Sequence, residues 1–341
     1  MSQHPFRAAC TPIVQRALLV LGGAFLLFAP PAGAGRVRPQ TSGPVFEAFS
    51  IPSVAAGKVR GVSVDGSSQL AAVVSDGQGL TVVDLSTGAM RLLKSSGIPY
   101  GVLVVGEMVY VAETTTNGSS ITLRAVDATK TKSALSVTQS VGLKGSFAGY
   151  GGNIALDDWV LYVAGSSAGL QLVDVSRAAY PSYLGAAWTS SGVSQVAVSD
   201  TRAAAFSYGG ARFGLFDTLQ PNSPRVLSDL PSSLGDIDID ANLVLLGSTT
   251  LQMVDYSDTT RPKILASTSL ASWPGGNFSF WGAEIVDFPT LTSLRVFRQN
   301  PPLQLIGQVA LDWTLSNWAV DAQRIYAVDT GSKLHVLERN F

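Results

Sequence analysis

The chain has 341 residues and is nearly neutral, with 23 lysine and arginine residues against 24 aspartate and glutamate residues. Only 14% of the residues are charged, which argues against the basic surface that binds nucleic acid or an anionic membrane. A single cysteine excludes an intrachain disulfide, and with two histidines it leaves too few ligands for a typical zinc or copper site.

Residues 1–34 have the pattern of a secretory signal peptide. Arg7 and Arg16 are followed by a twelve-residue apolar run at residues 17–28, and small residues at 32–34 provide a cleavage site. A membrane anchor is the alternative, but the run is shorter than the roughly 20 residues that cross a bilayer. We therefore expect cleavage after residue 34, no membrane insertion afterwards, and a secreted or periplasmic protein.

A short apolar strand that ends at a charged, usually acidic, residue recurs along the rest of the chain, most clearly as "GLQLVDVS" at residues 169–176. The last residue of this strand falls at seven positions, 38 to 47 residues apart: 84, 127, 174, 217, 255, 298 and 338. A period of about 40 residues with strand patterning is typical of four-stranded propeller blades. We therefore predict an all-β protein with a flexible leader at residues 35–43 and a single seven-bladed β-propeller domain at residues 44–341.

The expected strands begin with one at residues 46–51 that has no neighbours of its own. The blades that follow are expected at 59–64, 70–74, 80–84 and 90–93; at 102–105, 109–112, 121–127 and 134–141; at 153–156, 160–164, 170–174 and 182–186; and within 195–227, 236–267 and 277–309. Blade seven has only three strands in sequence, at 318–320, 325–328 and 334–337. Because an open array leaves a free edge, we predict that the strand at 46–51 completes the last blade and closes the ring.

The repeat resembles the LVIVD repeat of secreted and cell-surface proteins of bacteria and archaea. The resemblance rests on "GLxxVDxS" followed by "YPSYLG", and similar strings occur at residues 217–227 and 255–265. It covers residues 59–270 and is weaker in blades six and seven, where Arg298 and Glu338 replace the aspartate. The resemblance implies a β-propeller with a binding or scaffolding role, and it assigns no catalytic residues.

The aspartates that end the third strands are interpreted as turn residues, because an Asp carboxylate readily bonds to backbone N–H groups two residues further on. His335, the one histidine outside the signal peptide, occupies the second position of its third strand. The other repeats have Thr81, Arg124, Gln171, Gly214, Gln252 and Arg295 at this position. This variety indicates a generic polar position and argues against a Ser–His–Asp triad.

The string "DIDID" at residues 236–240 places three carboxylates on one side of the first strand of blade five. Asp238 occupies a channel-facing position that is small and mostly uncharged in the other blades. Asp236 belongs to a polar ring at one mouth of the channel. Calcium suits two carboxylates combined with amide and backbone oxygens, so Asp236 and Asp238 form a candidate metal site. The alternative, which we favour, is that backbone N–H groups and water satisfy both carboxylates and no cofactor is bound.

Aromatic residues occur in five of the six loops that connect one blade to the next, and these loops reach the same face, around the channel mouth. The candidate ligand-binding residues there are Tyr100, Tyr150, Trp188, Trp273 and Trp313. Aromatic side chains combine a large apolar area with a polar edge, which suits sugar rings or peptide side chains. The alternative is that the rings pack against neighbouring loops.

These patterns predict an exported, non-enzymatic propeller scaffold that binds a partner protein or glycan of the cell envelope at its channel-mouth loop face. A calcium-dependent propeller lactonase or hydrolase that uses Asp236 and Asp238 is the alternative hypothesis. A third hypothesis is a purely structural module of a cell-surface assembly.

Overall fold

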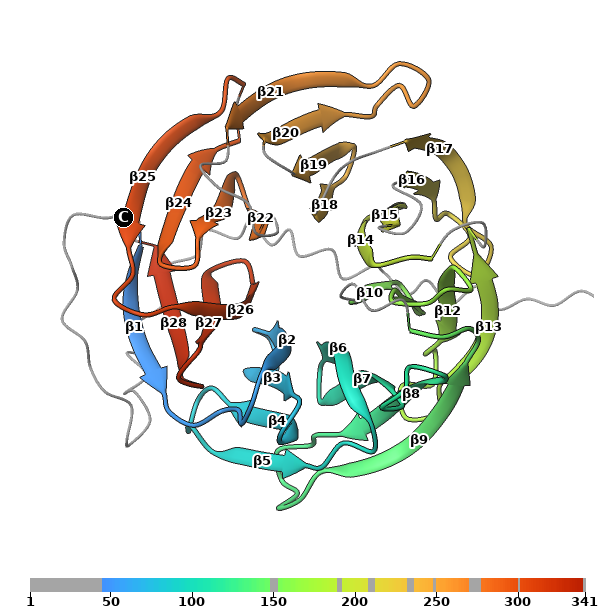
Figure 1. Cartoon of the computed structure of the whole chain (residues 1–341), viewed down its shortest axis with the longest axis vertical. Helices are drawn as coiled ribbons and strands as arrows, with labels where there is room; N and C mark the ends of the chain where they lie inside the picture. The colour runs from blue at the N-terminus through green and yellow to red at the C-terminus, as the bar shows by residue number, and fades with distance from the viewer. Residues whose placement is uncertain are drawn as a thin grey trace, which may run out of the picture.

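The computed structural model describes residues 45–147, 153–188, 192–207, 212–231, 236–247, 250–269, 277–299 and 301–339. These residues form seven four-stranded antiparallel sheets arranged around a central channel (Figure 1). No described residue is helical, and the described part of the chain therefore contains no helix able to cross a membrane. The predicted seven-bladed, all-β propeller is confirmed.

In blades one to six, the four strands follow one another in sequence, from the innermost strand to the outermost. Blade one is β2 (Val59–Asp65), β3 (Leu70–Ser75), β4 (Gly79–Asp84) and β5 (Met90–Leu93); blade two is β6 (Ile98–Val105), β7 (Met108–Thr114), β8 (Ile121–Asp127) and β9 (Ser136–Leu143); blade three is β10 (Ile154–Asp157), β11 (Val160–Val163), β12 (Leu170–Asp174) and β13 (Ser182–Ala187). Blade four is β14 (Gln195–Ser199), β15 (Arg202–Ser207), β16 (Arg212–Asp217) and β17 (Arg225–Pro231); blade five is β18 (Asp236–Asp240), β19 (Leu243–Gly247), β20 (Thr250–Asp255) and β21 (Lys263–Ser269); blade six is β22 (Asn277–Trp281), β23 (Glu284–Thr290), β24 (Ser293–Arg298) and β25 (Gln304–Ala310).

Blade seven combines the two ends of the described chain. Its inner three strands are β26 (Leu315–Val320), β27 (Arg324–Asp329) and β28 (Leu334–Arg339). The outermost strand is β1 (Val45–Ile51), which runs antiparallel to β28 from the Val45–Arg339 pair to the Ile51–Leu334 pair. The prediction that the amino-terminal strand closes the last blade is confirmed, and pairing with β28 covers an edge that would otherwise be free.

The apolar core lies between blades rather than inside any one of them. The described residues form seven hydrophobic clusters, and each cluster joins two neighbouring blades. Successive residues of a strand serve opposite joints: Val73 packs toward blade seven, whereas Ala72 and Val74 pack toward blade two. Because most strands are thus buried on both faces, few of their positions can hold a charged side chain. This accounts for the low charged content of the sequence.

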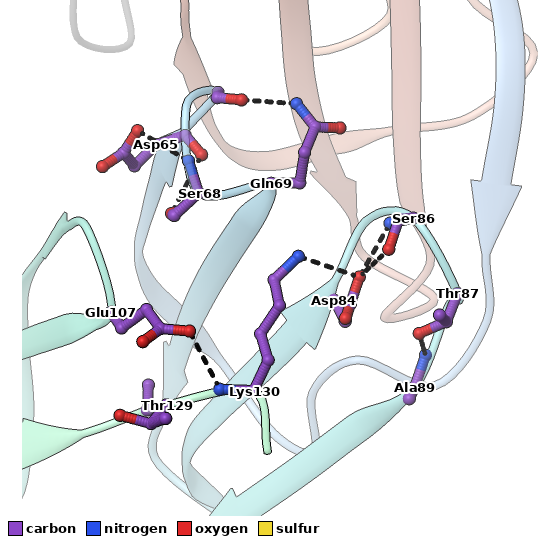
Figure 2. A network of polar contacts seen from close by, with 12 residues as sticks. Asp65, Ser68, Gln69, Asp84, Ser86, Thr87, Ala89, Glu107, Thr129 and Lys130 are labelled. Atoms are coloured by element: carbon purple, nitrogen blue, oxygen red, sulfur yellow. Dashed lines mark hydrogen bonds and ion pairs between the residues drawn. The ribbon is translucent and has the colours of Figure 1, made fainter. Parts of the chain in front are cut away.

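The acidic residues that end the third strands form the predicted turns. Asp84 accepts a hydrogen bond from the backbone N–H of Ser86 at 2.9 Å (Figure 2). The corresponding bonds are Asp127 from Thr129 at 2.9 Å, Asp174 from Ser176 at 2.7 Å, Asp217 from Leu219 at 3.0 Å and Asp255 from Ser257 at 2.7 Å. Asp84 is also 3.5 Å from the ammonium nitrogen of Lys130, in the following blade, so these turns also contribute contacts between blades.

Candidate functional site

The innermost strands enclose a cavity of about 500 Å³ in the central channel. Its lining combines apolar rings with polar side chains, among them Asn153, Asp236, Asp238, Phe278, Ser279 and Trp318. Asn153 and Asp236 lie at or next to the start of their inner strands, close to the connections from the preceding blades. The lining extends from these residues to Val320, the last residue of β26, so the cavity runs along the inner strands.

Strand β18 presents its carboxylates to this channel because of simple alternation. Ile237 and Ile239 are 7% and 5% exposed and pack in the cluster between blades four and five. Asp236 and Asp238 lie on the other side of the strand and line the cavity. The predicted orientation of these two residues is confirmed.

Asp238 has three hydrogen-bond donors within the protein. Its Oδ2 accepts from the hydroxyl of Ser279 at 2.6 Å and from the backbone N–H of Phe280 at 2.8 Å, both in blade six. Its Oδ1 accepts from the backbone N–H of Ile239 at 2.9 Å. Burial raises the pKa of the Asp238 carboxyl, and the negative charge of Asp240 acts in the same direction, against these three bonds. The carboxyl thus joins blade five to blade six, as the interpretation without a metal expects.

Asp236, like Asp238, is desolvated where it lines the cavity. Burial raises the pKa of its carboxyl well above the ordinary value, and the charge of Asp238 adds to this effect. The backbone N–H of Ile237, which donates to its Oδ1 at 3.0 Å, opposes the shift. Compared with an exposed aspartate, Asp236 therefore favours the neutral acid, which can both donate and accept a hydrogen bond.

A neutral carboxyl is a poor ligand for a hard cation. In the described part of the chain, no group of three or more histidine, cysteine, aspartate or glutamate residues is arranged to hold a metal ion. Ser279, Phe280 and Ile239 donate hydrogen bonds to the Asp238 oxygens that calcium would need. Calcium at this pair stays a prediction of the sequence.

Other inner strands are linked in the same way as β18 and β22. The Asn153 amide donates to the carbonyl of Val196 at 2.7 Å and accepts from the N–H of the same residue at 2.8 Å. The Ser63 hydroxyl accepts from the N–H of Val104 at 3.0 Å. Such side-chain links between neighbouring inner strands fix the channel wall, so that groups lining the cavity are held in place before any ligand arrives.

The aspartates at the ends of two inner strands, Asp65 and Asp157, have pKa values shifted in opposite directions. Asp65, at the end of β2, accepts from the backbone N–H of Gly106 in blade two at 2.6 Å. Burial opposes ionisation there, but hydrogen bonds from Ser67 and Gly106 lower the pKa of the Asp65 carboxyl below its ordinary value. Burial instead raises the pKa of Asp157, at the end of β10, to about 6, with the charges of Asp158 and Asp200 adding to the shift.

The candidate aromatic residues of the loop face are distributed over different joints. Tyr100 is 4% exposed, with its ring centroid 4.6 Å from that of Phe147. Trp188 is 8% exposed and donates its indole N–H to Asp229 at 3.1 Å. These two rings are packed into the joints between blades two and three and between blades three and four.

Trp313 is partly buried at the joint between blades six and seven and stacks on His335, with ring centroids 4.1 Å apart. Tyr150 and Trp273 lie outside the described residues. The structure thus brings together Asp236 and Asp238 but does not gather Tyr100, Trp188 and Trp313 around one hollow, and ligand binding by the loop face stays a prediction.

Trp318 is the cavity residue that sequence reasoning did not single out. It lines the cavity and also packs against Phe288, with ring centroids 4.8 Å apart. From the sequence, residues 318–320 are expected only as the first strand of blade seven, with no side of the strand assigned to the indole. Strand alternation does not identify a side chain that is large enough both to line the cavity and to pack against Phe288.

The second position of the third strand is a polar position, as predicted, and in three blades it holds a basic residue beside a carboxylate. Arg124 is 2.8 Å from Glu113, Arg295 is 2.9 Å from Asp287, and His335 is 3.0 Å from Asp329. The Arg295 side chain is 12% exposed, and the other five residues are no more than 9% exposed. The position therefore pairs buried charges within a blade, away from the cavity lining.

No family model and no curated protein matches this chain. Among solved structures, it is similar to the crystal structure of BamB from Moraxella catarrhalis, with a TM-score of 0.57. The two share 17% sequence identity, and the match covers 89% of this chain and 99% of the other. At this identity the likeness supports the fold alone: the chain is a seven-bladed β-propeller.

Proposed function

We propose that this chain is an exported, non-enzymatic scaffold that binds a partner protein or glycan of the cell envelope at the mouth of its channel. The observation that carries the proposal is the channel cavity, where Asp236 lies in a wall that also contains Phe278 and Trp318. A carboxyl group next to aromatic rings suits ligands that offer hydroxyl or amide groups. Sugar rings and extended peptides both have this chemistry.

The bonding of the carboxyls favours recognition over catalysis. A general base needs a free lone pair that can reach the proton it abstracts. Asp238 uses its oxygens on Ser279, Phe280 and Ile239. Its contacts are those of a residue that supports the wall, and Asp236, which also lines the cavity, is the group that we test for ligand contact.

The loop-face aromatics extend this proposal. Residues 148–152 and 270–276 connect blade two to β10 and blade five to β22, and they contain Tyr150 and Trp273. We propose that these two residues contribute to ligand binding at the loop face. Tyr100 and Trp188 are packed in joints between blades.

Site-specific photocrosslinking in intact cells tests the proposal. A photoreactive amino acid replaces Trp318 in one variant and Ile264, an outer-strand residue that is 62% exposed, in the control. We expect a discrete protein or glycan adduct from the channel position only. Adding Asp236→Ala should lower the adduct yield about tenfold, since one hydrogen bond in a desolvated site contributes roughly 1.4 kcal/mol.

Asp236→Asn is the matched variant, because the amide keeps a donor and an acceptor at the same place. It should keep most of the adduct. Equal adducts from both positions, or a yield that Asp236→Ala leaves unchanged, would contradict binding in the channel.

A further inference from the structure

The joint between blades three and four contains a buried polar group without a partner. Asp157 is the last residue of β10, the inner strand of blade three, and within the described part of the chain its buried Oδ2 forms no hydrogen bond. The Thr218 hydroxyl of blade four lies beside this carboxyl, and Thr218 is only 2% exposed. Its oxygen forms no well-aligned hydrogen bond with a described residue either. Because buried polar groups are normally paired, this end of the joint is exceptional.

The equivalent aspartates of two other blades have donors. Asp65, which ends β2 in blade one, accepts a backbone N–H of blade two at 2.6 Å. Asp321, which follows β26 in blade seven, accepts from the hydroxyl of Tyr326 at 2.9 Å. Tyr162 occupies the position of Tyr326 in blade three, but its hydroxyl donates to the carbonyl of Pro221 at 2.9 Å instead. The carboxyl of blade three is therefore left without this donor.

The charged groups around Asp157 add to the cost of its negative charge. Asp158 follows it in the turn to β11, and Asp200 lies in the corresponding turn of blade four. Tyr162, on β11, stays neutral because burial and the charge of Asp157 raise its pKa. Arg202, at the start of β15, lies opposite the aspartate that ends β16 in the strand register. Among the described residues, the charges that act on the Asp157 carboxyl are therefore both negative.

A single proton removes the charge that the joint does not compensate. Burial and the charges of Asp158 and Asp200 raise the pKa of Asp157 to about 6, and the Thr218 hydroxyl opposes them. A hydroxyl can donate to the carboxylate or accept from the neutral acid, so Thr218 serves either state. Asp158 and Asp200 favour only the neutral one. The carboxyl therefore gains its proton in mildly acidic surroundings and loses it at neutral pH.

The two inner strands at this joint are linked at the end far from Asp157. The Asn153 amide exchanges two hydrogen bonds with the backbone of Val196, at 2.7 and 2.8 Å. Residues of β10 and β14 also line the channel cavity. Because the link lies at the start of both strands, they can separate at the Asp157 end while it remains. A change at Asp157 then alters the wall of the channel.

We propose that Asp157, facing Asp158, Asp200 and the Thr218 hydroxyl, forms a proton-controlled seam between blades three and four. With the proton bound, the neutral acid bonds within the joint and the seam is closed. Once the proton is released, the carboxylate faces two like charges without a compensating donor. The two blades then separate more often at this end of the channel, so the seam is tighter in mildly acidic surroundings than in alkaline ones.

Thiol labelling of the full chain measures opening of the seam. Ala203, on β15, is fully buried in the joint between blades three and four. Ala71 has the same place on β3 and is fully buried in the joint between blades seven and one. Ala203→Cys and Ala71→Cys are each made with Cys10→Ser, so that the chain contains one thiol. Both react with a small aromatic disulfide reagent, and each rate is divided by that of free cysteine at the same pH.

The sign of the effect follows from the direction of the shift. Because the pKa of Asp157 is raised in the closed joint, closure weakens as the pH rises through about 6. We expect the corrected rate at Ala203→Cys to rise about tenfold between pH 5 and pH 8, the change that one unit of pKa difference produces. The rate at Ala71→Cys should not change, because Asp321 in that joint already has a donor.

Asp157→Asn imitates the neutral acid at every pH. It should hold the rate at Ala203→Cys at its acid-side value over the whole range. Asp65→Asn is the matched control at the equivalent position of blade one, and it should leave the profile at Ala203→Cys as in the wild type. A wild-type profile retained in Asp157→Asn, a profile flattened by Asp65→Asn, or parallel profiles at the two thiols would overturn the proposal.

Asp200→Asn tests the like charges and covers the case in which Asp157→Asn fails to fold. Asp200 has a φ of 52°, and asparagine adopts this left-handed conformation as readily as aspartate. The change removes one of the negative charges that raise the pKa of Asp157. The midpoint of the profile at Ala203→Cys should therefore move to lower pH. A merely structural role of Asp200 changes the rate without moving the midpoint, and an unmoved midpoint would also overturn the seam.

Discussion

Blade two and blade seven have the same design, although only blade two is continuous in sequence. In blade two, β6 to β9 follow one another, whereas blade seven takes β26 to β28 from one end of the described chain and β1 from the other. In both, the outer strand breaks register between the third and fourth residues of the third-strand motif: at Ala125/Val126 in blade two, and opposite Val336 and Leu337 in blade seven. The bulge thus marks the same place in a continuous and in a composite sheet.

The two blades differ in how their outer strands are held. Strand β9 buries Val141 and Leu143 in the joint with blade three and leaves other residues exposed, including Val137 at 38%. Strand β1 buries Phe49 and Ile51 against blade one as well as pairing with β28. No covalent turn joins β1 to β28, so buried apolar side chains and charge pairs hold β1 in the blade. Closure of blade seven therefore depends on side-chain contacts more than the attachment of the other outer strands does.

The largest expected effect comes from breaking the apolar part of that closure. Phe49→Asp places a charge in the joint between blades seven and one, where the phenyl ring is 9% exposed. Loss of the buried ring alone costs about 3–5 kcal/mol, and the carboxylate adds to this. We expect urea denaturation to show a large loss of stability or no cooperative folding.

Ile264→Asp is the matched change in an outer strand that is not borrowed. Ile264 lies on β21 and is 62% exposed. Its replacement should cost less than about 1 kcal/mol. Equal effects of the two substitutions would mean that β1 is held no differently from other outer strands.

The second-largest expected effect comes from breaking the buried Glu113–Arg124 ion pair of blade two. Glu113→Gln leaves Arg124, which is 9% exposed, without its counter-ion. Breaking a buried pair by removing one partner costs about 3 kcal/mol or more. Asp76→Asn is the control, since its pair with Arg60 is about one-third exposed and should contribute less than about 1 kcal/mol. The two variants are compared by their urea midpoints at neutral pH.

Much of this design follows from the sequence. The period of the third-strand motif predicts seven blades, and the missing fourth strand of blade seven predicts the role of β1. Boundaries are less predictable: β6 begins at Ile98 because a bulge at Pro99 and Gly101 lets the strand pass a proline, and β26 begins at Leu315 through a similar bulge. Bulges of this kind depend on the partner strand, which periodicity does not describe.

The site was less predictable than the fold, for a related reason. Alternation correctly placed Asp236 and Asp238 in the channel because only the strand itself is involved. Whether Tyr100 or Trp188 lies on the surface or in a joint depends on neighbours distant in sequence, Phe147 and Asp229. The partner of His335 on β1 is separated from it by almost the whole propeller, and no local pattern connects them.

The smallest expected effect comes from breaking the charged contacts that hold β1 in the closing blade. Glu47→Gln removes the anion that β1 places beside His335 and Lys333. At neutral pH we expect a loss of about 1 kcal/mol, less than in blade two because the contact is poorly aligned.

The acid side of the profile shows whether that loss is electrostatic. Burial raises the pKa of Glu47, but His335 and Lys333 lower it further, so the folded-state pKa lies below that of the unfolded chain. The stabilisation is therefore complete above the unfolded value of about 4.3 and disappears as the pH falls through the folded one. The wild type and Glu47→Gln should therefore converge in stability as the pH falls through that folded-state pKa, while Glu113→Gln stays destabilised relative to the wild type at pH 5 and above. A difference for Glu47→Gln that persists in acid would assign it to packing of the side chain, and the closing blade would then differ from blade two in its strands but not in its charges.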